Sequence, residues 1–495
     1  MEEDLEPEGK PPVRASAPLL AEEPAGSQRI RLARGGAILL ERDGFRLIEP
    51  RGLKRSRFHP YESIHHIYAS RRMLLIGTSS GLLTLRASEF VKTARGPAEA
   101  RSVLLARLAA RPEGPRLMAE VERLDELARR RPPKLAIWTL VALCVLGTLL
   151  QLRDPLVQHV GGFVPELFVR GELWRGVTSH LLHAMPAFPV HLGINLLGLL
   201  ALGHLVERPL GSARTAIVLG LGAVGSTVGV LLYDYPEVLG ASGLVAALAG
   251  GVLALELNHA EDVPAQWRLP RRLFIGALLA QLVLDQLLSH VLAGGAHLGG
   301  FVGGYLAVWL LGVPQPISRI EVGSLRLATA GVLSLLLFGV LGGVPLLRHD
   351  SAALERHAAR LYSAPPAFHL AIHDNAAAWF LATEGEHTTT GLELAVALAD
   401  RAVASTQRMN PDFLDTLAEA LFQAGDRFGA LLTIDEAISL VPHEPYFIEQ
   451  RRRFTGERDP DDRPPPPGSA QPSEQRGWPA RPEPLIDPEA PSVVI

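Results

Sequence analysis

Cysteine is almost absent from this 495-residue chain, which contains only Cys144. A single cysteine cannot form a disulfide within the chain or a cysteine-based metal site, so we expect neither. Excess positive charge is also missing, because the formal net charge is −4 at pH 7. Such a chain lacks the general attraction for a phosphate backbone, and we expect no nucleic acid partner.

A secretory leader is a further absence. The first residues, MEEDLEPEGKPPVRASAPLLAEEPAGS, do not combine a basic start with an apolar stretch. We therefore expect no cleavable signal peptide, and the first membrane helix should direct insertion. The acidic, proline-rich residues 1–27 and the Pro-, Arg- and Asp-rich residues 457–495 are typical of disordered tails.

Long apolar runs occupy the middle of the chain. Hydrophobic residues make up 47% of the sequence, and the mean hydropathy is +0.17. A helix that crosses a bilayer needs about 20 mostly apolar residues at about 1.5 Å each. We count seven runs near this length, which predicts seven membrane-spanning helices. The runs are 135–152, 188–206, 215–233, 239–257, 273–293, 295–312 and 325–347.

Basic residues gather on one side of these runs. Arg129, Arg130 and Arg131 precede the first, and the loops 208–214 and 261–272 carry more arginines, whereas 234–239 and 290–295 carry no Lys or Arg. The positive-inside rule places the N-terminus in the cytoplasm, although the outer loop 153–187 holds three arginines. Seven spans then leave the C-terminus outside. We expect a multi-pass protein of the plasma (inner) membrane.

Two soluble regions flank the spans. Residues 28–112 alternate β-type runs with turns and end in a helix-type segment, which resembles a small pleckstrin-homology-like barrel; an unspecified β domain fits equally well. Residues 370–445 resemble tetratricopeptide repeats, which are helix–turn–helix units of about 34 residues. Repeats of this kind would present a groove to a peptide or adaptor, and a plain helical hairpin is the alternative.

Four polar side chains stand inside the apolar runs. They are His191 and Asn195 in HLGIN, Ser242 in GASG and His297 in GGAHLGGFVGG. The second, fourth and sixth runs all enter from the outer side, and His191, Ser242 and His297 lie within about the first turn of each. Three helices therefore place them at similar depth. His191 and Asn195, four residues apart, share one helix face.

This combination suits serine-based hydrolysis of an amide. A serine hydroxyl needs a base within hydrogen-bond reach, which His297 can supply to Ser242. The oxyanion of the tetrahedral intermediate needs donors, and His191, Asn195 and the backbone N–H of Ser242 can supply these. Polar groups inside a membrane are expensive, which favours a functional role.

Glycines accompany both reactive residues. Gly240 and Gly243 permit a close backbone approach around the serine, while Gly300 and Gly304 follow His297 on one smooth face. Each motif alone has a plainer explanation, such as a serine bonded back to its own backbone or polar contacts between helices. Their occurrence at matched depth on alternate spans favours catalysis.

The set resembles the rhomboid family of intramembrane serine proteases over about residues 134–312. The matching motifs are ELWRGVTSHLLHA, with Trp174 and Arg175, then HLGIN, GHLVE, GASG and AHLGGFVGG. The resemblance implies an all-α six-span catalytic core with a seventh helix at 325–347. It also implies cleavage of transmembrane protein substrates in the lipid bilayer, without a cofactor or metal.

In that family the serine and histidine act as a dyad with no acidic third member, which carries over to Ser242 and His297. His191 and Asn195 would form the oxyanion site. One departure is Ala246, where the family often has an aromatic residue that packs on the histidine. Another group would then have to orient His297.

Three other functions are compatible with parts of the sequence. A catalytically idle rhomboid-like protein would bind membrane clients, although such relatives characteristically lose the serine or histidine. A scaffold would act through its soluble regions. A transporter would use intramembrane carboxylates, for which Glu256 and Asp285 are the main candidates.

Overall fold

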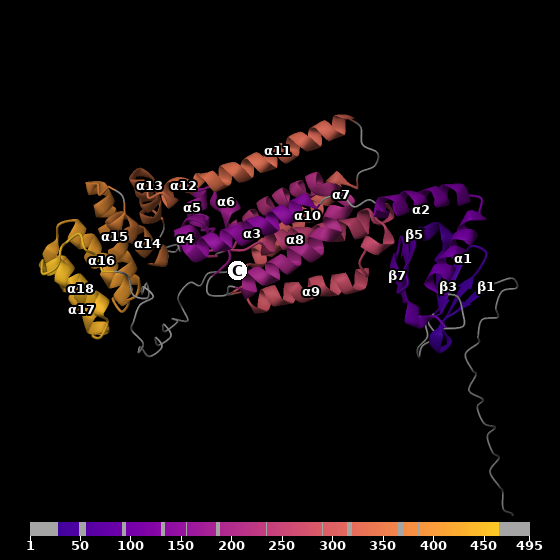
Figure 1. Cartoon of the computed structure of the whole chain (residues 1–495), viewed down its shortest axis with the longest axis horizontal. Coiled ribbons are helices and arrows are strands. Elements are labelled where there is room, and N and C mark those ends of the chain that lie inside the picture. Colours follow the sequence, from indigo (N-terminus) through magenta and orange to yellow (C-terminus); the bar gives the residue numbers. More distant parts are fainter. Residues whose placement is uncertain are drawn as a thin grey trace, which may run out of the picture. The chain divides into compact units, whose positions relative to one another are not determined.

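The structure is a computed structural model, shown in Figure 1, and it describes most of the chain in two compact units. The first unit comprises residues 1–126 and 264–266, and the second 127–263 and 267–495. The described residues are 28–48, 56–91, 96–129, 134–154, 156–184, 189–233, 235–289, 291–313, 319–364, 371–384 and 386–464. The tails expected at 1–27 and 457–495 lie outside them, apart from 457–464.

The first unit is built on two antiparallel sheets. Its strands are β1 (Gln28–Arg31), β2 (Ala37–Leu40), β3 (Gly44–Ile48) and β4 (Ser56–Pro60) in one sheet, and β5 (Ile64–Ala69), β6 (Met73–Thr78) and β7 (Gly81–Arg86) in the other. Two helices follow, α1 (Pro97–Ala109) and α2 (Gly114–Arg129). Leu104 and Leu108 lie on one face of α1 and are fully buried against the sheet residues. A small N-terminal β region is thus present, and its pleckstrin-homology-like character stays a prediction.

The second unit contains the apolar helices. They are α3 (Leu135–Arg153), α7 (Val190–Leu231), α8 (Ser242–Asn258), α9 (Arg271–Leu287), α10 (Gly294–Leu311) and α11 (Arg319–Gly342). Four stretches of the described residues are long and apolar enough to cross a membrane: 135–153, 190–231, 294–311 and 325–347. The helix α8 is apolar but shorter. A polytopic helical membrane protein follows from this, whereas the count of seven spans is not confirmed.

The helix α7 joins two of the expected spans. Its 42 residues would measure about 63 Å if straight. Instead Gly211 adopts a non-helical conformation, with φ +78°. Glycine has no Cβ, and the space where one would lie shows how close its neighbours are. A Cβ on Gly240 would contact His191, at the start of α7, and a Cβ on Gly243 would contact Ser226, near the end of α7. Both ends of α7 therefore reach the same turn, so the chain reverses near Gly211.

Glycines allow α7, α8 and α10 to pack at backbone distance. A Cβ on Gly304 would overlap the carbonyl oxygen of Ala247, and one on Gly300 would overlap that of Gly243. Gly225 and Gly299 approach each other in the same way across α7 and α10. Small residues let membrane helices gain van der Waals contact without a hydrophobic driving force.

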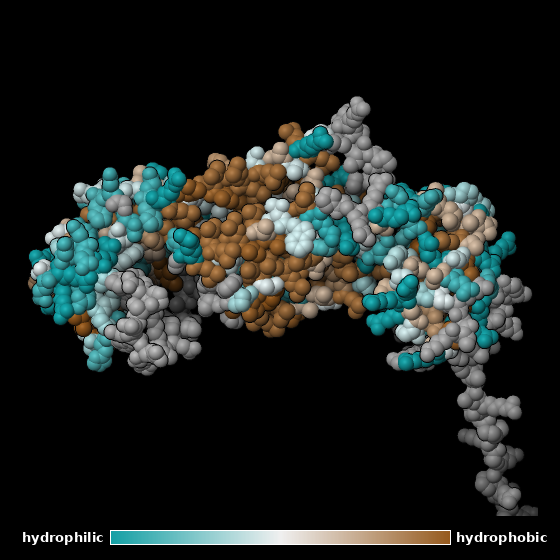
Figure 2. All heavy atoms as spheres, in the orientation of Figure 1, coloured by the Kyte–Doolittle hydropathy of each residue, from teal (hydrophilic) through white to brown (hydrophobic). Residues whose placement is uncertain are grey.

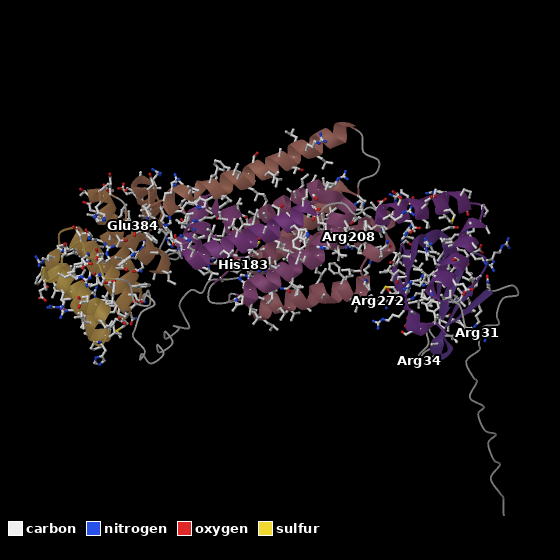
Figure 3. All side chains as sticks on the ribbon, viewed as in Figure 1. Arg31, Arg34, His183, Arg208, Arg272 and Glu384 are labelled. Atoms are coloured by element: carbon white, nitrogen blue, oxygen red, sulfur yellow. The ribbon has the colours of Figure 1, made fainter. Side chains whose placement is uncertain are left out.

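The apolar surface and the arginines of this unit agree with a membrane position. Figure 2 shows hydrophobic residues gathered over the middle helices, whereas the C-terminal helices are mostly hydrophilic. In Figure 3, Arg208 and Arg272 lie toward one end of the helix bundle and His183 toward the other. The bundle therefore has an arginine-bearing end and an opposite end near His183.

The loop that follows α3, which we expect on the outer side and call the outer loop, is compact. It forms the short helices α4 (Leu156–Gly161), α5 (Pro165–Val169) and α6 (Arg175–Thr178), and the 3-10 turn Ser179–Leu181. Arg175 is fully buried and paired with Glu172 at 2.7 Å. Its guanidinium also donates to the carbonyl oxygens of His159, at 2.9 Å, and Gly162, at 2.7 Å. Arg175 thereby fixes the loop, as Trp174 does by donating from Nε1 to the carbonyl oxygen of Val160.

The C-terminal region is a series of paired helices. These are α12 (Val344–Leu347), α13 (Ser351–Tyr362), α14 (Ala371–Thr383), α15 (Thr389–Ser405), α16 (Pro411–Gln423), α17 (Arg427–Leu440) and α18 (Pro445–Thr455). Asn410 and Glu444 cap α16 and α18, whose first residues, 411 and 445, are 34 residues apart. That spacing equals a tetratricopeptide unit. The repeat assignment itself is not confirmed and stays a prediction.

Candidate active site

Ser242 is the first residue of α8. The preceding turn contains Gly240 with φ +120°, a conformation that residues with a side chain rarely adopt. Ser242 is partly exposed, and it lines a small pocket together with Ser179, His180 and Ser226. The side chain of Ser242 is therefore partly open rather than sealed inside the helix bundle.

His297 lies in the first turn of α10, next to the start of α8. A Cβ on Gly243 would be 3.5 Å from the carbonyl oxygen of Ala296. This contact brings Ser242 beside the turn that carries His297. Nε2 of His297 is buried and has no hydrogen-bond partner among the described residues. The serine–histidine bond is therefore not closed here, as is common before substrate binds.

The other ring nitrogen of His297 meets a carboxylate that our sequence analysis did not assign to the site. Nδ1 of His297 is 2.8 Å from Oδ1 of Asp285, near the end of α9. Asp285 also accepts a hydrogen bond from Nε2 of Gln281 at 2.9 Å. The resemblance to a dyad did not anticipate this group. Its signal was an aspartate in an apolar run, 12 residues before His297, which we had considered only as a transporter carboxylate.

His191 and Asn195 lie in the first turns of α7, next to the serine. Nδ1 of His191 accepts a hydrogen bond from the backbone N–H of Ala184 at 3.2 Å. A neutral imidazole that accepts at Nδ1 carries its proton on Nε2, and this Nε2 would be 2.7 Å from a Cβ on Gly240. Asn195 donates from Nδ2 to the carbonyl oxygen of His191 at 3.0 Å, which leaves the second N–H of that amide for another acceptor.

The start of α8 supplies further donors. The first N–H groups of an α-helix have no partner within the helix, and Ser242 and Gly243 occupy these positions. The backbone donors, His191 Nε2–H and Asn195 Nδ2–H meet around the Gly240 turn. This arrangement suits a negatively charged oxygen that forms beside the serine hydroxyl.

Two histidines of the outer loop complete the surroundings. Burial lowers the pKa of His180 to about 4 and that of His183 to about 3. The His183 ring lies edge-on to His191, with centroids 5.1 Å apart, and its Nδ1 is 3.1 Å from Thr148 Oγ1. Both are therefore neutral near pH 7. They belong to the SHLLHA stretch, whose histidines our sequence analysis did not single out.

The remaining site predictions lie in supporting positions. Trp174 and Arg175 bind the outer loop to itself rather than to the reactive residues. Gly300 and Gly304 hold α10 against α8. In the part of the chain that the structure describes, no group of three or more His, Cys, Asp or Glu side chains is arranged to hold a metal ion.

The two carboxylates considered for transport are both engaged. Glu256 forms a buried ion pair with Arg268, at 3.0 Å. Asp285 is bonded to His297 and Gln281. Neither stands as an isolated carboxylate along an ion path.

The membrane core of this chain is similar to known proteins. Residues 170–314 match the family described as Rhomboid domain. The chain is 31% identical over 206 residues to Rhomboid protease GluP of Bacillus subtilis, covering 40% of this chain and 37% of that protein. It is 30% identical over 161 residues to RHOMBOID-like protein 4 of Arabidopsis thaliana, covering 31% of this chain and 38% of the relative. The matched stretches thus span less than half of either relative. Over its membrane core this chain is therefore similar to proteins of the rhomboid family.

Proposed function

We propose that this protein is an intramembrane serine endopeptidase that cleaves transmembrane segments of other membrane proteins. The observation that carries the proposal is Nε2 of His297, which is buried beside the serine that begins α8 and has no hydrogen-bond partner in the part of the chain that the structure describes. A nitrogen that is buried without a partner is costly. A serine hydroxyl that moves into hydrogen-bond reach removes this cost.

The mechanism uses these groups in order. Nε2 of His297 takes the proton from Ser242 Oγ as the oxygen attacks the peptide carbonyl carbon. The resulting oxyanion accepts hydrogen bonds from Asn195 Nδ2–H, His191 Nε2–H and the backbone N–H of Ser242. His297 then gives its proton to the leaving amine, and an acyl-serine remains. Water, deprotonated by the same nitrogen, releases the acid and restores the serine.

The position of Ser242 supports the proposed substrate class. A helix within a bilayer hides its carbonyl groups in its own hydrogen bonds, so the segment must unwind before attack. Ser242 is the first residue of α8 and lines a small pocket. A serine at the start of a membrane helix would meet a substrate where unwinding is least costly, and water for the second step would enter at the same end.

We extend the proposal to the whole chain. Residues 134–312 would form the catalytic core and 325–347 a seventh spanning helix, with the N-terminus cytoplasmic and the C-terminus outside the inner membrane. Residues 28–112 would be a pleckstrin-homology-like domain. Residues 370–445 would be tetratricopeptide-like repeats that bind a peptide or adaptor.

A serine-directed probe tests the proposal. The full chain in detergent is treated with a labelled fluorophosphonate, and cleavage of a model single-span substrate is followed in parallel. Ser242→Ala should abolish both signals, and His297→Ala should be equally inactive because the two groups act as one unit. Ser226→Ala, which removes another hydroxyl from the same pocket, should still label. Labelling that survives Ser242→Ala, or a wild type that neither labels nor cleaves, would favour a catalytically idle client-binding protein.

A further inference from the structure

We propose that Asp285 is the positioning residue of the catalytic base, fixing both the tautomer and the orientation of His297. This inference rests on the proposed protease function and adds a third member to the expected pair. Asp285 is not a catalytic residue in the strict sense, because it contacts the base and not the substrate. Its carboxylate acts only through the His297 ring.

The burial of Asp285 is exceptional for its helix. The side chains of α9 are mostly exposed, as suits a helix facing lipid, and only Phe274 and Asp285 are buried. A carboxylate in apolar surroundings is tolerated only when hydrogen bonds compensate for its lost hydration. Oδ1 of Asp285 receives two such contacts, from His297 and Gln281. The helix therefore turns its one aspartate toward the base.

The hydrogen bond assigns the protons of His297. An ionised carboxylate can only accept hydrogen bonds, so Nδ1 of His297 must be the donor in the 2.8 Å contact. The neutral ring then has a bare Nε2, which is the form that can take a proton from Ser242. This is the buried nitrogen that has no hydrogen-bond partner within the described ranges.

His191 provides the opposite case within the same site. Its Nδ1 accepts from the backbone N–H of Ala184, which places the proton on Nε2. One histidine thus presents a donor and the other an acceptor. In each case the hydrogen-bond partner of Nδ1 determines whether Nε2 is a donor or an acceptor, because the two ring nitrogens of a neutral imidazole have complementary roles. The site needs both forms, one for the oxyanion and one for the base.

The surroundings hold the Asp285–His297 contact in place. The Cβ position of Gly294, at the start of α10, is 3.2 Å from the Cβ of Asp285. The backbone N–H of Gly295 donates to the hydroxyl of Tyr235 at 2.9 Å. The titratable groups that face this pair are His191 from α7 and Tyr235 from the segment before α8.

With Ala246 in place of an aromatic residue, the carboxylate of Asp285 is the group that orients the His297 ring.

The test compares Asp285→Asn with the wild type in the full chain. The amide can present an N–H to Nδ1 and so favours the wrong tautomer. We expect kcat to fall by about 10²–10⁴-fold, with KM changed by less than about threefold because substrate contacts remain. Leu284→Ala, on an exposed neighbouring position of α9, is the matched control and should retain wild-type kcat. Gln281→Ala, which removes the second contact to the carboxylate, should give a smaller loss.

A second measurement does not depend on proteolysis. Diethyl pyrocarbonate acylates an imidazole nitrogen that carries no proton, and modification of His297 is quantified by mass spectrometry at one fixed pH. Asp285→Asn can present an N–H to Nδ1 and so moves the ring proton to Nε2, which should slow acylation at Nε2 severalfold, whereas Leu284→Ala should leave it unchanged. An unchanged rate of acylation together with wild-type kcat would overturn the role of Asp285. Slower acylation of Asp285→Asn in a protein whose wild type fails to label with fluorophosphonate would support the contact and overturn only the protease function.

Discussion

Nδ1 of His357, in α13, is 2.8 Å from Oε1 of Glu172, in the outer loop of the membrane core. Oε2 of the same carboxylate accepts a hydrogen bond from Nε of Arg175, and all three side chains are buried. Burial alone would raise the pKa of Glu172, but Arg175 and His357 hold it below its usual range. The C-terminal helices and the outer loop therefore share one charged cluster inside a common hydrophobic core.

Glu172→Gln should destabilise the protein strongly. It leaves Arg175 buried without its counter-ion, and breaking a buried pair costs about 3–5 kcal/mol. Thermal unfolding in detergent is expected to begin at a distinctly lower temperature. Glu436→Gln removes an exposed partner of Arg408 and should change the free energy of unfolding by less than about 1 kcal/mol. Equal effects of the two substitutions would contradict a structural role for the buried cluster.

Stability should fall in mild acid because of His159. Nε2 of His159 is 3.2 Å from Nε2 of His357, and its Nδ1 is 3.0 Å from Nδ1 of His373. Burial first, then these two histidines and Arg175, hold the pKa of His159 well below its usual value. Above about pH 6.5, His159 is neutral in both the folded and the unfolded state, so it adds no pH dependence to the free energy of unfolding. Below that, the unfolded chain takes up the proton first, so the folded state loses stability as pH falls.

The measurement for His159 is the unfolding temperature at pH 7.5 and at pH 5. The wild type should show a drop that His159→Phe reduces, because Phe cannot be protonated and Phe380 already packs nearby, with ring centroids 6.3 Å apart. An equal drop in both proteins would assign the acid sensitivity to other groups.

Gly304→Ala should disrupt the helix packing on which the site depends. The added Cβ would overlap the backbone oxygen of Ala247, which cannot move aside as a flexible side chain could. Overpacking of this kind costs about 1–3 kcal/mol, and fluorophosphonate labelling of Ser242 should drop with it. Gly331→Ala, in α11 with open space at its Cβ position, is the control and should label normally. Full labelling of Gly304→Ala would show that α8 and α10 can separate without harm.

Asn195→Ala should be milder than loss of the nucleophile. One oxyanion donor is worth about 10²–10³-fold in kcat, and less where His191 and the backbone compensate. Steady-state cleavage of the model substrate measures this, with Asn258→Ala as the control, since Asn258 bonds to Tyr305 away from the site. An Asn195→Ala protein as inactive as Ser242→Ala would indicate a structural role instead.

The C-terminal helices should lie on the same side of the membrane as the outer loop. Leu354 and Ala358 of α13 share a buried cluster with Leu156 and Val160 of that loop. Fusions after Pro442 to alkaline phosphatase, which is active only outside, and to a fluorescent protein that matures in the cytoplasm, test this. Phosphatase activity is expected; cytoplasmic fluorescence would contradict the orientation assigned from the arginines.

The sequence by itself determined where polar residues interrupt the apolar runs, and from this it predicted which residues carry the chemistry and roughly how deep they lie. Ser242, His297, His191 and Asn195 are polar residues in apolar runs, and their distance from the run ends follows from a constant rise per residue. The arginine bias predicted which end of the bundle faces the cytoplasm. The β-type runs of residues 28–112 predicted a small sheet region because turn residues separate them at short intervals.

Only the tertiary structure decided how these helices are rotated against one another. In a membrane helix every face is apolar, so periodicity cannot distinguish a lipid-facing position from one that faces the core. For that reason Asp285 could be seen in the sequence but not its contact with His297, and the proton positions of His191 and His297 could not be assigned. The reversal at Gly211 inside one helical run and the burial of Glu172 against His357 also depend on contacts between distant segments. Such contacts leave no local pattern, because they are made by packing rather than by spacing along the chain.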